Sequence, residues 1–261
     1  MIVTDTVTVH KRGNDCAETH PEDYKIELNL DHTNIGIGMS GGLDSSMLLW
    51  LLAHHIDEND LDITIHQWTC IHEEKPWQHI YAKKAIAFVK QEFPNVKFGE
   101  HMVRMTNAKD YIDNGTRLSW DLVNTHKITA LFNGVTTNPS DEIGEPVWKE
   151  RWKRRATKRD FENRQWWIDN RSVDVCTNHT EYLPFIHTDK RIVLAFYKKY
   201  GVFVSLGGLT RSCEGWIEDT NHFTTECRGC WWCVEKEWAT SAIFNYDAIK
   251  AVSTWTELDI D

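Results

Sequence analysis

Residues 34–53 read NIGIGMSGGLDSSMLLWLLA, and this stretch decides the fold of the chain. It begins with a short apolar run that suits a buried strand, and residues 47–53 continue without a helix breaker. The turn between them, SGGLDSS at residues 40–46, combines adjacent glycines with several serines. Glycines let backbone N–H groups approach an anion closely, and a helix N-terminus adds a positive dipole. The pattern therefore predicts a phosphate-binding turn between a strand and a helix.

The candidate ligands of such a phosphate all lie in this turn. Its hydroxyl groups can donate hydrogen bonds, and its glycine amides can face phosphate oxygens. Its carboxylate can start the helix or hold a metal ion that bridges phosphates. The candidate cofactor-binding residues are Ser40, Gly41, Gly42, Asp44, Ser45 and Ser46.

Strand-like and helix-like segments alternate from this turn to residue 138. Strands are predicted at residues 61–70, 97–105 and 128–135, and helices at 77–93 and 118–126. Such alternation is typical of a Rossmann-like α/β fold, in which helices flank a doubly wound parallel sheet. Ligands bind beyond the carboxyl ends of its strands. The segments expected at the site are residues 40–45, 68–72 and 133–138.

Four parts of the chain differ in pattern. Residues 1–33 form an N-terminal extension whose alternating polarity indicates a short strand pair, and residues 34–138 form the α/β core. Residues 139–182 are a basic, tryptophan-rich insertion, and residues 183–261 are a helical region with a cysteine site. In this last part Thr188 or Asp189 suits a helix N-cap. Lys190 then falls in the first helical turn, where it is either solvated or reaches phosphate.

Four cysteines cluster in the last part of the chain. Cys227, Cys230 and Cys233 form two overlapping C-x2-C units, and Cys213 lies 14 positions upstream. This spacing brings two sulfurs to one ion across a tight turn, and four thiolates close a tetrahedral zinc site. Structural zinc is favoured, an iron–sulfur cluster is the main alternative, and a redox dithiol is less favoured. The isolated cysteines, interpreted as small core residues, are Cys16, Cys70 and Cys176.

Composition narrows the class of protein further. The 261 residues are 41% hydrophobic and 26% charged, as in folded globular proteins, and the formal net charge is −10. No run approaches the 18 apolar residues of a membrane span, and the N-terminus has no secretory-signal pattern. A cytoplasmic location without membrane contact is therefore expected. The acidic total argues against general coating of polyanions.

Residues 148–171 contrast with this acidic background. They contain nine Lys/Arg and four Asp/Glu, a local charge of +5, together with four tryptophans. Basic residues interleaved with aromatics suit phosphate contacts and base stacking in a nucleic acid. A solvated amphipathic insertion is nevertheless favoured, and a lid over an anionic nucleotide is a third interpretation. The 13 tryptophans of the chain also leave apolar area for a homodimer interface.

The turn at residues 40–46 resembles the SGGxDS loop of the PP-loop ATP pyrophosphatase superfamily, and it lies in the same strand–turn–helix context. The resemblance implies a fold of the adenine nucleotide alpha-hydrolase type. It also implies that ATP is cleaved between its α and β phosphates, with Mg²⁺ present, and that a substrate is activated as an adenylate. The loop would hold the pyrophosphate part of ATP.

Within that superfamily, the C-terminal part resembles the 7-cyano-7-deazaguanine synthases of the queuosine (preQ0) pathway. Residues 183–202, LPFIHTDKRIVLAFYKKYGV, resemble the family's apolar-Pro segment and lysine-led helix. CRGCWWC at residues 227–233 resembles its closing cysteine cluster, with Arg228 inserted. The resemblance implies Asp44 and Lys190 as catalytic residues and a small C-terminal zinc-binding subdomain. The implied zinc ligands are Cys213, Cys227, Cys230 and Cys233.

That family converts 7-carboxy-7-deazaguanine to the nitrile with ATP and ammonia, so these are the implied substrate and amine donor. Segments that would contact the substrate depart from the family pattern: residues 68–72 read WTCIH, and Asn138 replaces an acid. Adenylation is thus better supported than substrate identity. The alternatives are a PP-loop enzyme that adenylates a nucleic acid or protein, or inserts sulfur, and a non-catalytic nucleotide-binding module.

Overall fold

The centre of the protein is a five-stranded parallel sheet with helices on both faces, which confirms the predicted α/β fold class. The computed structural model describes residues 1–12, 19–73, 77–107, 111–139, 179–214, 220 and 225–244. Every neighbouring strand pair in the order β5-β4-β3-β6-β7 is parallel. The strands are β3 (Asn34–Gly38), β4 (Thr64–His72), β5 (Lys97–Thr106), β6 (Ala130–Phe132) and β7 (Thr180–Tyr182).

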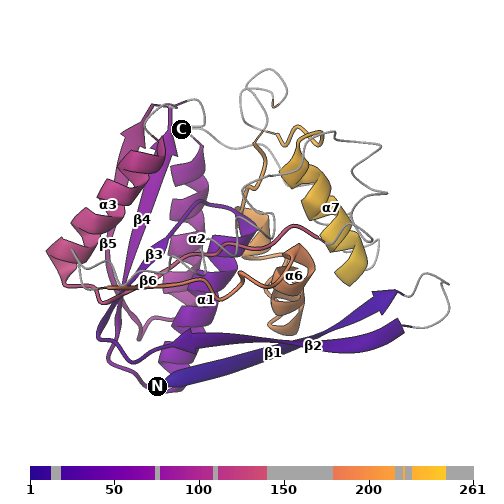
Figure 1. Cartoon of the computed structure of the whole chain (residues 1–261), viewed down its shortest axis with the longest axis horizontal. Coiled ribbons are helices and arrows are strands. Elements are labelled where there is room, and N and C mark those ends of the chain that lie inside the picture. Colours follow the sequence, from indigo (N-terminus) through magenta and orange to yellow (C-terminus); the bar gives the residue numbers. More distant parts are fainter. Residues whose placement is uncertain are drawn as a thin grey trace.

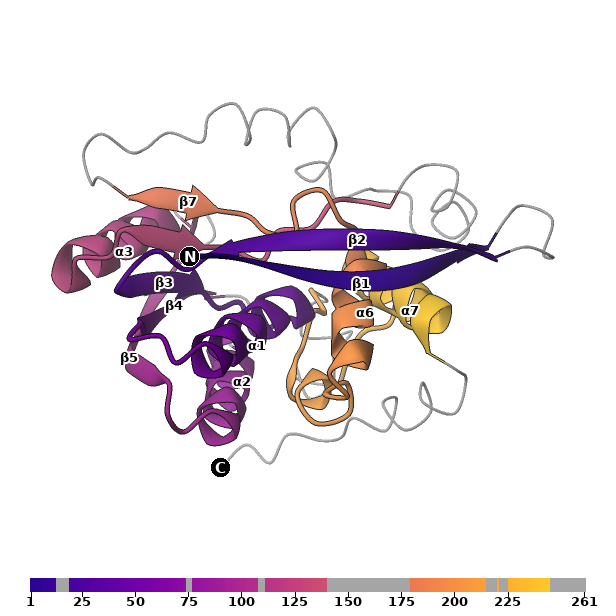
Figure 2. The ribbon, with the colours of Figure 1, turned by 90° about the horizontal axis from the view of Figure 1, so that it is seen from below.

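Three helices cover the two faces of the sheet. Helices α1 (Leu43–Glu58) and α2 (Gln78–Glu92) lie on one face, and α3 (Tyr111–His126) lies on the other (Figure 2). The face under α3 has a core of its own, in which Leu122 and Val123 pack against Leu131. Gly36 of β3 has no room for a larger side chain, because a Cβ there would lie 2.5 Å from Leu131. This close packing holds β3 in the middle of the sheet.

Two elements differ from the sequence prediction. Helix α3 begins at Tyr111 rather than at residue 118, although Gly115 is a poor helix former. The earlier turns pack on β4, where Gly115 faces Cys70, so tertiary contact outweighs local propensity. Strand β7 was not predicted, because its three residues, TEY, have no apolar alternation. It pairs with β6 and lies in the segment assigned to the insertion.

A long hairpin precedes the sheet, as the alternating N-terminal pattern predicted. Strands β1 (Ile2–Arg12) and β2 (Thr19–Asn29) are antiparallel and form a separate two-stranded sheet. Val7, Val9 and Ile26 on one face are buried in the same core as α1 and the central sheet. Alternate residues therefore point to the core or to solvent.

The C-terminal part adds helices α6 (Lys190–Lys199) and α7 (Trp231–Ile243), joined through a short 3-10 helix at Gly207–Leu209 (Figure 1). Asp189 caps α6, since its side chain accepts a hydrogen bond from Arg191 N. Tyr197 of α6 donates its hydroxyl to Leu43 O at the start of α1, over 3.0 Å. This contact holds α6 beside the start of α1, next to the predicted phosphate turn.

Several predicted features lie outside the described residues. These include the basic segment 148–171 and the isolated cysteines Cys16 and Cys176. None of the helices in the described part of the chain is long and apolar enough to cross a membrane.

Candidate functional site

The SGGLDSS turn lies at the carboxyl end of β3 and leads directly into α1. Gly41 has a φ of +75°, a conformation that side chains other than glycine rarely adopt. A Cβ on Gly41 would lie 2.7 Å from Gln78 O and 2.9 Å from Ala82 N, so the turn packs directly on the start of α2. Gly42 is the N-cap of α1, and the positive end of the helix dipole therefore opens at the turn.

Hydroxyl groups converge on the backbone amides of this turn. Ser45 Oγ lies 3.1 Å from Ser40 Oγ and accepts from Ser40 N. Ser40 Oγ accepts from Gly42 N, and Ser212 Oγ accepts from Leu43 N, each over 3.3 Å. These are long hydrogen bonds between neutral groups. Charged phosphate oxygens would form stronger bonds with the same donors.

Asp44 and Lys190, which are far apart in the sequence, meet beside this turn. Lys190 is 2% exposed, and its Nζ lies 2.5 Å from Asp44 Oδ2. The same Nζ lies 3.9 Å from Oε2 of Glu235, a fully buried carboxylate on α7. The lysine therefore balances two carboxylates in a region shielded from water, where an unpaired charge is costly.

The other carboxylate oxygen of Asp44 fits a metal ion. Asp44 Oδ1 is buried and has no hydrogen-bond partner among the described residues. Carboxylate oxygens are the protein ligands that Mg²⁺ prefers, usually together with substrate phosphates. The side chain can thus pair with Lys190 through one oxygen and hold a cation through the other.

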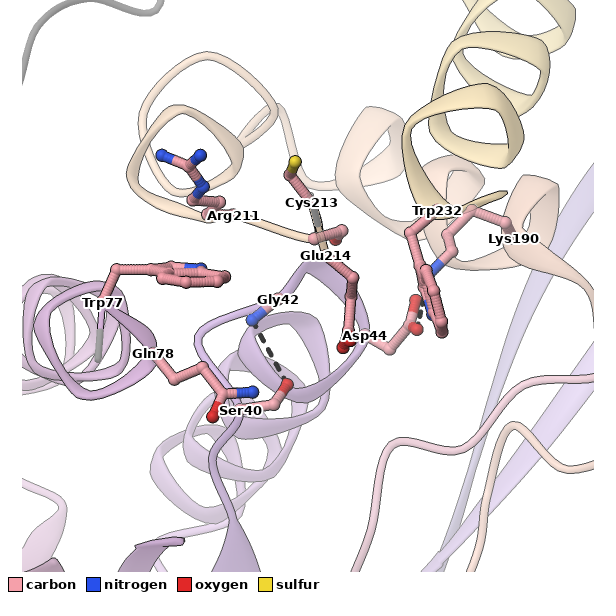
Figure 3. Close-up of a pocket in the computed structure, with 11 residues that line it drawn as sticks. Ser40, Gly42, Asp44, Trp77, Gln78, Lys190, Arg211, Cys213, Glu214 and Trp232 are labelled. Atoms are coloured by element: carbon pink, nitrogen blue, oxygen red, sulfur yellow. Dashed lines mark hydrogen bonds and ion pairs between the residues drawn. The ribbon is translucent and has the colours of Figure 1, made fainter. Parts of the chain in front are cut away.

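These residues open into one pocket between the starts of α1 and α2 and the C-terminal loops (Figure 3). Lys190 reaches Asp44 beside Trp232, while Arg211 lies over Trp77. The residues that line this pocket are Ser40, Gly42, Asp44, Trp77, Gln78, Lys190, Arg211, Ser212, Cys213, Glu214 and Trp232. Gly41, Ser45 and Ser46, which the sequence also predicted, belong to the turn but do not line the pocket.

Arg211 supplies a second cation to the pocket. Its guanidinium carbon lies 5.4 Å from the ring centre of Trp77 and 5.8 Å from that of Tyr81, both near the start of α2. Its backbone N–H donates to Gly41 O over 2.8 Å, which ties the C-terminal loop to the turn. Its guanidinium also donates to Thr225 O, and Lys190 and Arg211 thus both bring positive charge to the pocket beside the turn.

The four clustered cysteines come together as their spacing predicted. Their sulfur atoms all lie within 4.8 Å of one another. Cys227 N donates to Cys213 Sγ and Cys230 N donates to Cys227 Sγ, each over 3.3 Å. Arg228, the inserted residue, takes a φ of +56° and turns the chain between two of the ligands. Cys230 is the N-cap of α7, so Cys233 falls in the first turn of that helix.

The chemistry of this donor set suits a metal. Hydrogen bonding to Cys213, and burial in addition, raise the pKa of the Cys230 and Cys233 thiols. Closely packed sulfurs disfavour each other's thiolate forms, and a bound cation removes that penalty by neutralising the charge. Four sulfurs at this separation fit either zinc or an iron–sulfur cluster.

The cysteine cluster adjoins the pocket. Cys213 lines the same hollow as Ser40 and Asp44, and Glu214 N donates to Cys230 Sγ over 3.4 Å. The sequence analysis placed the cysteines in a small subdomain without locating it relative to the turn. Because the C-terminal loop folds back onto α1, one residue of the cysteine cluster and residues of the phosphate turn line the same pocket.

Two other segments expected at the site do not line this pocket, although Gly134 packs on the turn, since a Cβ there would lie 2.9 Å from Ser45 N. None of residues 68–72 or 133–138 lines the pocket. Asn133 Nδ2 instead donates to Glu181 Oε1 over 2.6 Å, and Thr69 hydroxyl donates to Met39 O over 2.7 Å. These polar side chains join neighbouring strands.

Sequence reasoning missed the aromatic and acidic members of the site. Trp77, Gln78, Trp232 and Glu235 were not singled out. A signal existed for Glu235, because a carboxylate within the apolar stretch WWCVEKEW needs a cationic partner once it is buried. No local pattern marks Trp77 or Gln78, which reach the pocket only because α2 packs beside the turn.

The sheet, the glycine turn and the helix that follows it define a Rossmann-like α/β protein, with the turn at a helix N-terminus where an anion can be bound. No protein-family model matches the chain, and no curated protein matches it. Among solved structures, the U34-tRNA thiolase NcsA from Methanococcus maripaludis, with its [4Fe-4S] cluster, is 10% identical with a TM-score of 0.43. The match covers 93% of this chain and 73% of that one.

NAD+ synthetase from Burkholderia pseudomallei is 13% identical with a TM-score of 0.32, over 86% of this chain and 79% of that chain. Likenesses this distant carry no conclusion about activity, which is therefore argued from the site itself.

Proposed function

We propose that the protein is an ATP-dependent adenylating enzyme that cleaves ATP between the α and β phosphates. Its acceptor is a 7-carboxy-7-deazaguanine carboxylate, which it converts with ammonia to the amide and then to the nitrile. The observation that carries the adenylating step is the meeting of the SGGLDSS turn with Lys190 and Arg211 in one pocket. A helix N-terminus and two cations around one turn are what a polyphosphate requires.

In the first half-reaction, a carboxylate oxygen of the acceptor attacks the α phosphorus of ATP, and the α–β phosphoanhydride bond breaks. Pyrophosphate leaves into the turn, where Ser40, Gly42 and the start of α1 bind its oxygens. Ammonia then attacks the acyl carbon, AMP leaves and the nitrogen loses a proton to give the amide. A second ATP adenylates the amide oxygen, and loss of AMP and the remaining amide protons gives the nitrile.

Asp44 and Lys190 act at the phosphates. When Mg²⁺ is bound, it neutralises phosphate charge, and Asp44 Oδ1 is the side-chain atom that fits it. The Asp44 and Glu235 carboxylates orient the Lys190 ammonium group through ion pairs. Once nucleotide binds, this group donates a hydrogen bond to a phosphate oxygen. Stabilising charge that develops during phosphoryl transfer is the main task of such groups.

The acceptor identity is supported by the pocket's aromatic and acidic lining. Trp232 offers a ring face on which a planar heterocycle can stack. Glu214, also in the lining, offers a carboxylate that can accept hydrogen bonds from the amino edge of a guanine-like ring. The resemblance of residues 183–202 and 227–233 to the 7-cyano-7-deazaguanine synthases points to the same acceptor.

The test is to mix the protein with ATP, Mg²⁺, ammonia and 7-carboxy-7-deazaguanine, and to follow AMP, pyrophosphate and the nitrile by mass spectrometry. We expect AMP release that requires the carboxylate, and nitrile that also requires ammonia. Release of AMP with another acceptor only would reject the substrate assignment. No AMP with any carboxylate would reject the adenylating function.

The cysteine cluster supports one alternative, a sulfur-inserting enzyme, because Cys213 reaches the pocket where the activated substrate would lie. Zinc keeps this cluster structural, whereas an iron–sulfur cluster can take part in sulfur transfer. Elemental analysis of protein purified without oxygen decides between them. We expect zinc, and stoichiometric iron with acid-labile sulfide would favour sulfur insertion.

A further inference from the structure

A second group of metal-ligand side chains lies at the far end of α1 from the SGGLDSS turn. His54, His55 and Glu58 lie at the C-terminal end of this helix. Glu58 Oε2 lies 3.7 Å from His54 Nε2 and 3.4 Å from His55 Nδ1. One ligand atom from each residue lies within 4.8 Å of the other two. Two ring nitrogens thus face one carboxylate oxygen.

His55 is oriented so that one nitrogen is available to a ligand. Its side chain is only 7% exposed, and Asp5 Oδ2 lies 3.1 Å from its Nε2. A carboxylate only accepts hydrogen bonds, so Nε2 donates to Asp5 and Nδ1 is the nitrogen that faces Glu58. His55 Nδ1 is buried and has no hydrogen-bond partner in the described part of the chain. A carboxylate behind a histidine is the arrangement that orients metal-binding imidazoles.

The orienting carboxylate is itself held firmly. Asp5 lies on β1, and Lys199 Nζ and Tyr200 hydroxyl each donate to it over 2.5 Å. His54 is positioned by aromatic rings: it stacks on Trp50, with ring centres 4.9 Å apart and planes 20° apart. The two imidazoles are therefore fixed by residues from three elements, namely the hairpin, α1 and α6.

We propose that His54, His55 and Glu58 form a second metal site, for a divalent transition ion such as zinc. Two imidazoles and a carboxylate are a common ligand set for such ions, with water in the remaining position. Bond lengths of about 2.0–2.1 Å place neighbouring donors about 3.4 Å apart. The two distances to Glu58 are close to this value, and the two imidazole nitrogens lie within 4.8 Å of each other.

The position of the site also favours a cation. The last turn of a helix carries the negative end of its dipole. The three residues lie about 15–21 Å from Asp44 along α1, at about 1.5 Å per residue, so the site is separate from the nucleotide pocket. It joins α1 to the N-terminal hairpin through Asp5. A structural metal here would stabilise the packing of the β1–β2 hairpin on α1, because Asp5 of β1 contacts His55.

The test is titration of the full-length, as-isolated protein with Co²⁺, followed by optical spectroscopy and by NMR of the histidine ring nitrogens. Thiolate-bound Co²⁺ shows a near-ultraviolet sulfur band, which His/Glu-bound Co²⁺ lacks. We expect one Co²⁺ per chain without the sulfur band, with the His54 and His55 signals affected first. Glu58→Gln and His54→Gln should each weaken this binding at least tenfold.

The matched control is Asp57→Asn, which removes a neighbouring exposed carboxylate from the same helical turn and should leave binding unchanged. Glu58 has a 60% exposed side chain, so its variant should fold with an unaltered Tm in the absence of added metal. Equal binding by wild type and Glu58→Gln would overturn the proposal. A second contrary result would be NMR signals showing that the His55 ring carries a proton on each nitrogen and does not change on addition of Co²⁺.

Discussion

Lys190 Nζ lies 2.5 Å from Asp44 Oδ2, although 146 positions separate the two residues in the sequence. Glu235 lies on the other side of the same ammonium group, 3.9 Å away. One buried cation thereby joins the first turn of α6, the phosphate turn and α7. Five predictions follow from this arrangement and from the rest of the described structure.

Replacing Lys190 with Met removes the buried ammonium group that lies between the Asp44 and Glu235 carboxylates. We expect a loss of about 3–5 kcal/mol in the free energy of unfolding and no AMP release. Adding Glu235→Gln should recover part of the stability, because it removes a negative charge from a fully buried position, but none of the activity. Urea unfolding of both single variants and the double variant measures this coupling. Strictly additive losses would show that Glu235 does not depend on Lys190.

Asp44→Asn should reduce turnover at least ~100-fold with little change in Tm, because the amide keeps the shape of the side chain but cannot hold Mg²⁺ as a carboxylate does. The measurement is AMP release over a range of Mg²⁺ concentrations. Asp57→Asn, at the exposed end of the same helix, is the control and should keep full activity. An unchanged Mg²⁺ dependence in Asp44→Asn would contradict the assignment.

Cys230→Ala should release the metal and loosen α7, because metal binding supplies folding free energy. Metal content by elemental analysis and hydrogen exchange across Trp231–Ile243 report the two effects. Cys70→Ala is the matched control, since Cys70 is also a buried cysteine outside any disulfide but is not part of the cluster. Metal retention by the Cys230 variant would remove this residue from the ligand set.

Gly41→Ala and Gly201→Ala separate backbone strain from packing. Both glycines have positive φ, at +75° and +68°. A Cβ on Gly201 would meet nothing within 4 Å, whereas one on Gly41 would press into the backbone of α2. We expect Gly201→Ala to cost about 1–2 kcal/mol of stability and Gly41→Ala a further 1–3 kcal/mol. Equal costs in urea unfolding would argue against tight contact between the turn and α2.

Stability should fall between pH 6.5 and pH 4 in part because of His101. Burial lowers the pKa of His101 to about 4, against about 6.5 in an unfolded chain. In this interval the unfolded chain binds a proton that the folded protein does not, so acid favours unfolding. His101→Gln keeps a donor for Thr69 hydroxyl, which lies 2.7 Å from His101 Nε2. It should flatten the dependence of Tm on pH, and an unaltered slope would exclude this cause.

Much of the fold was predictable because its signals are local. The glycine turn at residues 40–46 needs backbone conformations that few residues other than glycine adopt, and strand–helix alternation indicates a parallel sheet. For the same reason, the helix cap was predicted at Thr188 or Asp189, and Asp189 is the N-cap of α6. Strand β7 was not predictable, because its three residues, TEY, form a strand only by pairing with β6.

The candidate site divides in the same way. The sequence by itself determined which residues form the turn and which cysteines cluster, since C-x2-C spacing acts over one tight turn. Only the tertiary structure decided that Cys213 lines the pocket, that Lys190 pairs with Asp44 and Glu235, and that Trp77 and Arg211 stand opposite them. These pairings depend on how α6, α7 and α2 pack around α1. Such packing is settled by shape and buried charge across long sequence separations, which no local spacing records.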